Sequence, residues 1–179
     1  MTSSQLSDRL TDRALNMYIG NSLAVMPRIT LADWWECDVL RVTPNLYTTE
    51  LEIKVSRSDF LADRAKARQL FANSWYESML APAWEVKHLR LANRESAVPN
   101  RFYFVMPKGL VREEEVPAWA GIIWAEAEGG WNEVRRAPML HKRKCDTQLV
   151  QDMCETAMWR YCRSEIRRAT GRLLPMFGT

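Results

Sequence analysis

Residues 47–55 carry the most regular pattern in the chain and constrain its fold more than any other segment. The alternate positions along this segment are Tyr47, Thr49, Leu51, Ile53 and Val55. Alternation with a period of two is typical of a β-strand with one buried and one accessible face. Residues 36–42 predict a second short strand, and Pro44 and Asn45 supply turn chemistry between the two. The sequence therefore predicts a β-hairpin in this part of the chain.

Around this hairpin, the remainder of the chain mixes helices with short strands. Helices are predicted over residues 7–21, 60–80 and 145–170. Further strands are predicted over residues 102–106, 120–127 and 132–137, and residues 89–100 are predicted to be a loop. This order predicts an α/β fold with a mixed central β-sheet flanked by helices and a long basic C-terminal helix. We expect a single domain over residues 1–179, with the helix 145–170 packed on the core or appended to it.

The composition is that of an ordinary globular domain. The 179 residues are 47% hydrophobic and 26% charged, which excludes disordered, collagen-like and fibrous chains. We expect no transmembrane helix, because no run of about 18 apolar residues occurs, and no secretion signal, because residues 1–13 are polar.

The cysteines at 37, 145, 154 and 162 have no common zinc spacing and predict reduced thiols. We therefore expect a protein of the cytoplasm. A zinc site formed by His141, Cys145 and Cys154 is the weaker alternative.

Positive charge is concentrated near the C-terminus. Residues 135–172 hold ten basic and four acidic groups, a net charge of +6, whereas the whole chain has a net charge of only +3. Arg160, Arg163 and Arg167 are spaced to form one stripe along the predicted helix. Such asymmetry is typical of a protein that binds a polyanion, although a solvated helix face explains the charge alone equally well.

The predicted hairpin brings opposed carboxylates together. Pairing its strands about Asn45 places Asp38 opposite Glu52, with Cβ atoms about 4.5–5.5 Å apart. The two like charges would repel each other, and a divalent cation between them would reverse that interaction. Oxygen ligands at this separation suit magnesium or manganese. Lys54 shares the face of Glu52, where its ammonium could stabilise a developing negative charge. We favour this chemistry over a solvated strand in which Lys54 pairs with a neighbouring carboxylate.

At these residues the sequence resembles the PD-(D/E)xK nuclease superfamily. The hallmark of that superfamily is an acidic residue followed, after a short gap, by Asp/Glu-x-Lys on an adjoining strand, and here Asp38 and Glu52-Ile53-Lys54 match it. The closer resemblance is to the MmcB-like DNA-repair family and its phage-encoded relatives. It runs from about residue 30 to residue 141 and is carried by residues 35–40, 52–60, 100–107, 117–123 and 137–141.

The resemblance implies a restriction-endonuclease-like core and a metal-dependent deoxyribonuclease. In such a site Asp38, Glu52 and the backbone carbonyl of Ile53 would bind Mg²⁺ or Mn²⁺. Lys54 would orient the attacking water and stabilise the transition state of phosphodiester hydrolysis. The implied role is that of an endonuclease in DNA repair, recombination or phage DNA processing, in the cytoplasm of a bacterium or a phage-infected host. The alternative is a DNA-binding or scaffold module that keeps the fold without efficient cleavage.

Other residues are candidates for supporting roles, and two positions depart from the family pattern. Cys37 stands where the family has proline, and only Asp8 and Asp12 are available where many relatives have a ligating glutamate on the first helix. The accessory ligand candidates are Glu36, Glu50, Asp12 and Gln69. The candidates for contact with nucleic acid are Arg57, Lys87, His88, Arg160, Arg163 and Arg167. DNA is the expected partner and a membrane is not, and the oligomeric state is left open, with a homodimer as one option.

Overall fold

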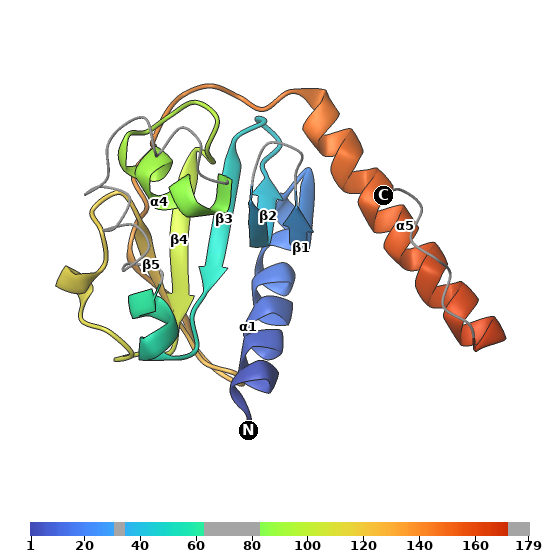
Figure 1. Cartoon of the computed structure of the whole chain (residues 1–179), viewed down its shortest axis with the longest axis horizontal. Coiled ribbons are helices and arrows are strands. Elements are labelled where there is room, and N and C mark those ends of the chain that lie inside the picture. The colour runs from blue at the N-terminus through green and yellow to red at the C-terminus, as the bar shows by residue number, and fades with distance from the viewer. Residues whose placement is uncertain (31–34, 63–82, 172–179) are drawn as a thin grey trace. The chain divides into compact units, whose positions relative to one another are not determined.

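The computed structural model of the chain describes residues 1–30, 35–62 and 83–171 (Figure 1). These residues belong to two compact units, 1–145 and 146–179. The first unit contains the elements α1 (Ser3–Tyr18), η1 (Ile19–Asn21), β1 (Ala24–Thr30), β2 (Glu36–Val42), β3 (Thr48–Ile53), α4 (Ala83–Ala92), β4 (Arg101–Met106), η2 (Glu113–Glu115), β5 (Gly121–Ala125) and β6 (Trp131–Arg135). The second contains α5 (Thr147–Thr170). Residues 57–62 are also helical, and the rest of the helix predicted over 60–80, including Gln69, lies outside the described residues.

A six-stranded mixed sheet forms the centre of the first unit. Its strands lie in the order β1-β2-β3-β4-β5-β6, which can be followed from blue to yellow in Figure 1. The pairs β1–β2, β2–β3 and β5–β6 are antiparallel, whereas β3–β4 and β4–β5 are parallel. The prediction of an α/β fold with a mixed central sheet is therefore confirmed. No helix among the described residues is long and apolar enough to cross a membrane.

The hairpin β2–β3 has the predicted register. Val39 pairs with Leu51 and Val42 with Thr48, which centres the turn on Asn45. Within this turn the amide of Thr43 donates to the carbonyl of Tyr47 over 2.9 Å. Asp38 lies one step beyond the last registered pair, on the strand next to Glu52.

The two faces of the sheet bury different kinds of side chain. On one face, Leu10 and Ala14 of α1 join the apolar cluster of Leu51, Ile53 and neighbouring strand residues. Successive strand residues point to opposite faces, so Glu50 and Glu52 lie on the other. There they neighbour Phe102 and Phe104, their register partners on β4. The carboxylates of β3 are thus held against an aromatic layer, away from α1.

Besides the one-turn helix η2, the strand β1 and the helix α4 were not predicted from the sequence. No strand was predicted over β1, which contains Pro27; proline is tolerated there because β1 is an edge strand that needs few hydrogen bonds on its outer side. The segment 89–100, predicted to be a loop, begins inside α4. The described inward side chains of α4 include the buried Lys87 and His88, so this helix lacks the apolar periodicity by which a helix is found in a sequence.

The second unit is a helix with well-defined ends. The side chain of Asp146 accepts a hydrogen bond from the amide of Leu149 over 3.0 Å, which is a helix N-cap. Gly171 ends the helix in the left-handed conformation with φ 67°, as its position after the helical pattern predicts. The sequence therefore predicts both ends of α5 to within two residues.

Candidate active site

Four charged side chains from β3, the residue after it and α4 form a continuous ion-pair cluster. The Lys87 ammonium lies 2.7 Å from Glu50 Oε1 and 2.6 Å from Glu52 Oε2. Lys54 Nζ lies 3.0 Å from the other oxygen of Glu52. All four side chains are buried or nearly so, with exposed fractions between 0% and 13%. A chain of alternating charges in this setting fixes each carboxylate in one orientation.

Glu50 is the anchor of this cluster. Its side chain is fully buried, and Trp35 Nε1 donates to its two oxygens over 2.8 and 3.0 Å. Burial raises the pKa of Glu50, an effect that Lys87 opposes and Glu52 reinforces. Glu50 shares the face of Glu52 as predicted, but Lys87 and Trp35 occupy its oxygens. It serves here as a counter-charge for Lys87.

Glu52 and Lys54 sit where β3 ends. Burial by itself would raise the pKa of Glu52, but the ammonium groups of Lys87 and Lys54 outweigh it and lower that pKa to about 2. Glu52 is therefore ionised throughout the neutral range. Lys54 also lies 3.7 Å from Asp59 Oδ1, at the start of the following helix. Its ammonium is thus held between two carboxylates at the end of the strand.

Asp38 joins the cluster from the adjoining strand and forms no ion pair with any described residue, although Lys54 and Lys87 act on it from a greater distance. Its Oδ2 accepts a hydrogen bond from the amide of Ile53 over 2.7 Å. Burial, followed by repulsion from Glu52, raises the pKa of Asp38 to about 6, against the opposing effect of that hydrogen bond. A partly buried carboxylate repelled by a neighbouring carboxylate is a group that a bound cation would stabilise.

The donor set at this point fits a hard divalent cation only in part. Asp38 and Glu52 offer oxygen ligands of the kind that magnesium and manganese prefer. However, no group of three or more His, Cys, Asp and Glu side chains among the described residues is arranged to hold a metal. A cation here would therefore rest on Asp38, Glu52 and the Ile53 carbonyl, with water and substrate oxygens as its other ligands.

The structure leaves several predicted residues outside this cluster. Asp12 is exposed on α1, the helix that packs on the opposite face of the sheet, so the prediction of an accessory role at this site is not supported. Glu36 is exposed on β2, and its side chain makes no hydrogen bond or ion pair with any described residue. Arg57 is exposed, and its guanidinium makes a two-point contact with Glu115, over 3.1 and 2.5 Å.

The two α4 residues predicted to contact phosphate are buried. Lys87 is occupied by Glu50 and Glu52, and only 7% of its surface is exposed. The ring of His88 stacks on Phe104 and meets Trp119 edge-on, with centroids 6.4 and 5.5 Å apart. In this structure neither side chain presents its polar atoms as a surface contact for DNA.

The role of Lys87 and Trp35 was not found from the sequence. Trp35 lies next to the predicted strand, and nothing in the sequence points to a partner for its indole nitrogen. Lys87 is far from the hairpin in sequence and has no motif around it. The signal that would have pointed to them is the pair Glu50 and Glu52 on one strand face, since two adjacent buried carboxylates require a cation nearby.

His141, a residue of the alternative zinc site, uses both of its ring nitrogens in contacts with other residues of the chain. His141 Nε2 lies 2.7 Å from the carbonyl of Val98, and its Nδ1 lies 3.2 Å from Asn100 Nδ2. Asn100, which is buried, also donates to the carbonyl oxygens of His141 and Arg143. Both ring nitrogens of His141 thus have partners that fix the segment leading to α5.

Comparison with known proteins gives a fold relative but no function. The chain matches no family model and no curated protein. Among solved structures it is similar to a protein of unknown function from Silicibacter pomeroyi, with a TM-score of 0.62 and 18% sequence identity. That alignment covers 99% of each chain. At this level of identity the likeness shows a shared fold alone.

The raised pKa of Asp38 predicts a pH-dependent difference in stability between the protein and Asp38→Asn. A carboxyl with a folded-state pKa above its unfolded value stabilises the fold at low pH, and the stabilisation is lost as pH rises from about 4 to about 6. Asparagine can still accept the hydrogen bond from Ile53 but carries no charge. We expect the variant to be more stable than the wild type by about 2 kcal/mol at pH 7 and nearly equal at pH 4. Urea unfolding at both pH values, without divalent cations, measures this. A variant less stable than the wild type at pH 7 would contradict the assignment.

Proposed function

We propose that the protein is a metal-dependent DNA endonuclease with its active site at Asp38, Glu52 and Lys54. The observation that carries the proposal is that the predicted hairpin register brings these three residues to one end of two adjoining strands. There Asp38 bonds to the amide of Ile53, and Lys54 lies 3.0 Å from Glu52. An acid on one strand and Glu-x-Lys on the next is the arrangement that the family resemblance calls for. A restriction-endonuclease-like core is part of the same proposal.

In this function the residues of the chain would divide the work of phosphodiester hydrolysis. Asp38 and Glu52 would hold the cation, with the backbone carbonyl of Ile53. When bound, the cation would neutralise phosphate charge and lower the pKa of a water molecule. Lys54 would orient the attacking water and stabilise negative charge on the phosphate in the transition state. Lys87 would keep Glu52 in place through its second oxygen.

The test is cleavage of labelled plasmid, duplex, flap and single-stranded DNA in the presence of magnesium or manganese. We expect cleavage of at least one substrate, its loss in EDTA, and its loss in Asp38→Ala. Arg112→Gln, which changes an exposed charge, serves as the matched control and should cleave like the wild type. Cleavage that persists in Asp38→Ala would exclude this site.

One observation favours a second candidate function. Each oxygen of Glu52 already contacts an ammonium group, so the carboxylate is electrostatically satisfied without a metal. This arrangement would suit a DNA-binding or scaffold module that retains the fold without cleavage. Absence of cleavage of every substrate, with DNA binding equal in the wild type and Asp38→Ala, would support this module and overturn the nuclease.

A further inference from the structure

Lys87 lies between two carboxylates of β3, at the place where a single cation would contact them both. Its Nζ is 2.7 Å from Glu50 Oε1 and 2.6 Å from Glu52 Oε2. Oxygen pairs of this kind are ligands that magnesium and manganese prefer. Many enzymes that hydrolyse phosphodiesters hold two such ions, about 3.5–4 Å apart. In this chain an ammonium group stands at one place where an ion could bind.

The surroundings of Lys87 hold its ammonium in this place. The ring centroids of Trp35 and Phe102 lie 5.3 and 5.2 Å from Nζ, within the distance at which an aromatic ring attracts a cation. Trp35 also donates to both oxygens of Glu50, so that carboxylate is fixed as well. Two aromatic rings and two carboxylates thus surround one ammonium group.

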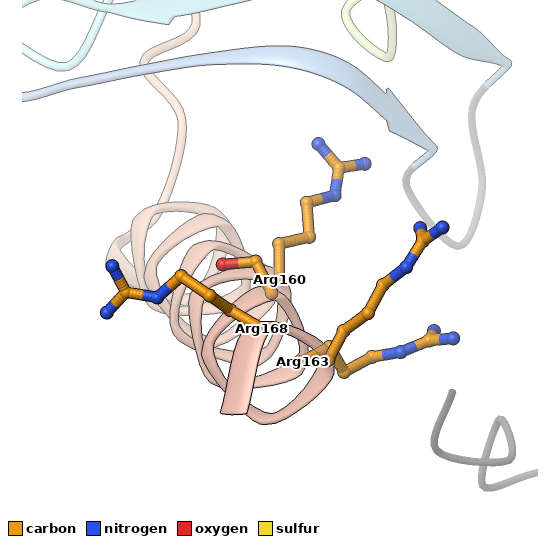
Figure 2. A pocket seen from close by; sticks show the side chains of 5 residues that line it. Arg160, Arg163 and Arg168 are labelled. Carbon is orange, nitrogen blue, oxygen red and sulfur yellow. The ribbon is translucent and has the colours of Figure 1, made fainter. Parts of the chain in front are cut away.

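Lys87 differs in its surroundings from the arginines of α5 that the sequence also predicted as contacts for nucleic acid. Arg160 and Arg163 line an open hollow on that helix, and their side chains project away from the helix axis (Figure 2). The side chain of Lys87 is only 9% exposed, and both of its close polar contacts are carboxylate oxygens. A lysine enclosed in this way balances charge inside the fold.

The charges at the end of β3 call for one further cation at most. The carboxylates of Asp38, Glu50 and Glu52 meet the ammonium groups of Lys54 and Lys87, which leaves one negative charge among these five groups. One divalent cation at Asp38 and Glu52 would more than balance that charge. A second would have to displace Lys87 and leave a buried ammonium without its carboxylates, which is strongly unfavourable.

We propose that Lys87 is a built-in cation that fills the position of a second metal ion, between Glu50 and Glu52, and so limits the site to at most one divalent cation. Removal of the ammonium is then expected to open a cation site between these two carboxylates that the wild type lacks. The inference rests on the proposed function for the use of the remaining cation in cleavage, but not for the position that Lys87 occupies.

The test is binding of Mn²⁺ to the full chain without DNA, measured by the loss of the EPR signal of free Mn²⁺. We expect the wild type to bind one Mn²⁺ per chain and Lys87→Met to bind one more than the wild type. Lys87→Met/Glu50→Gln, which lacks one of the two carboxylates, should return to the wild-type number. The matched control Lys108→Met removes the charge of an exposed lysine in the first unit and should bind as the wild type does.

Two further measurements keep the test decisive if Lys87→Met is only marginally stable. An ion that binds only the folded chain stabilises it, so Mn²⁺ should raise the urea midpoint of Lys87→Met by more than that of the wild type. Glu50→Gln keeps Lys87 and removes one carboxylate that would hold a second ion. We expect this variant to bind as many Mn²⁺ ions as the wild type.

Two results would overturn the inference. One is the binding of two Mn²⁺ by the wild type, with one of them lost in Glu50→Gln. The other is a Lys87→Met chain that gains neither a bound Mn²⁺ nor additional stabilisation by Mn²⁺. Failure of the proposed function would look different. If the wild type and Asp38→Ala bind no Mn²⁺ but Lys87→Met binds one, the metal site at Asp38 is excluded and the role of Lys87 stands.

Discussion

Lys87→Met is expected to destabilise the protein by about 3–5 kcal/mol at pH 7, which is the usual cost of leaving a buried charge without its partner. Lys87 is 2.7 Å from Glu50, and the side chain of Glu50 is 0% exposed. Methionine has nearly the same length as lysine, so the substitution removes the charge with little change in packed volume. Glu50 and Glu52 would then repel each other, although Trp35 would still donate to Glu50.

The double variant Lys87→Met/Glu50→Gln separates electrostatics from packing. Glutamine can still accept a hydrogen bond from Trp35 and has no charge that needs a cation. We expect the double variant to be more stable than Lys87→Met alone, which a double-mutant cycle by urea unfolding would quantify. Lowering the pH should also reduce the difference in stability between Lys87→Met and the wild type. The pKa of Glu50 is raised, so Glu50 can take up a proton and lose the charge that needs a cation. A loss below about 1 kcal/mol in Lys87→Met would mean that the cluster contributes little to folding.

Local patterns predicted the hairpin and the acid–lysine geometry well. Strict alternation and a short turn fix a register, because a slip of one residue would move every apolar side chain to the wrong face. For this reason the pairing of Leu40 with Glu50, and with it the position of Asp38 beside Glu52, followed from residues 36–55 alone. The C-terminal end of α5 followed from the local signal of Gly171 in the same way.

The features that were missed depend on contacts between distant parts of the chain. Lys87 meets Glu52 across 35 positions, and no local pattern encodes that distance. A buried lysine on α4 also weakens the apolar periodicity that would have revealed the helix. Similarly, Arg57 follows the strand as a phosphate contact would, but its partner Glu115 is 58 positions away. Local sequence thus indicates which groups share a strand face, and tertiary structure decides which charges are already neutralised.

Lys54→Met is expected to reduce DNA cleavage by about 10²–10³-fold if the proposed nuclease activity holds, because a preorganised positive charge at the phosphate is lost. The fold should tolerate this change better than Lys87→Met. Glu52 keeps its contact with Lys87 at 2.6 Å, and Asp59 is half-exposed and can be solvated. Single-turnover cleavage with saturating enzyme measures the chemical step without a contribution from DNA affinity.

A matched control for Lys54→Met is Arg57→Gln, which removes a positive charge three residues away and breaks the contact with Glu115 instead of one with Glu52. We expect it to cleave within a few-fold of the wild type, and we expect both variants to bind the labelled DNA substrate in EDTA as the wild type does. Loss of binding together with cleavage in Lys54→Met would make Lys54 a binding residue. Equal loss of cleavage in both variants would show that positive charge near the end of β3 matters and that the position of Lys54 does not. The expected result is a loss of cleavage in Lys54→Met but not in Arg57→Gln. That result would show that cleavage depends on the ammonium group held beside Glu52 at the end of β3.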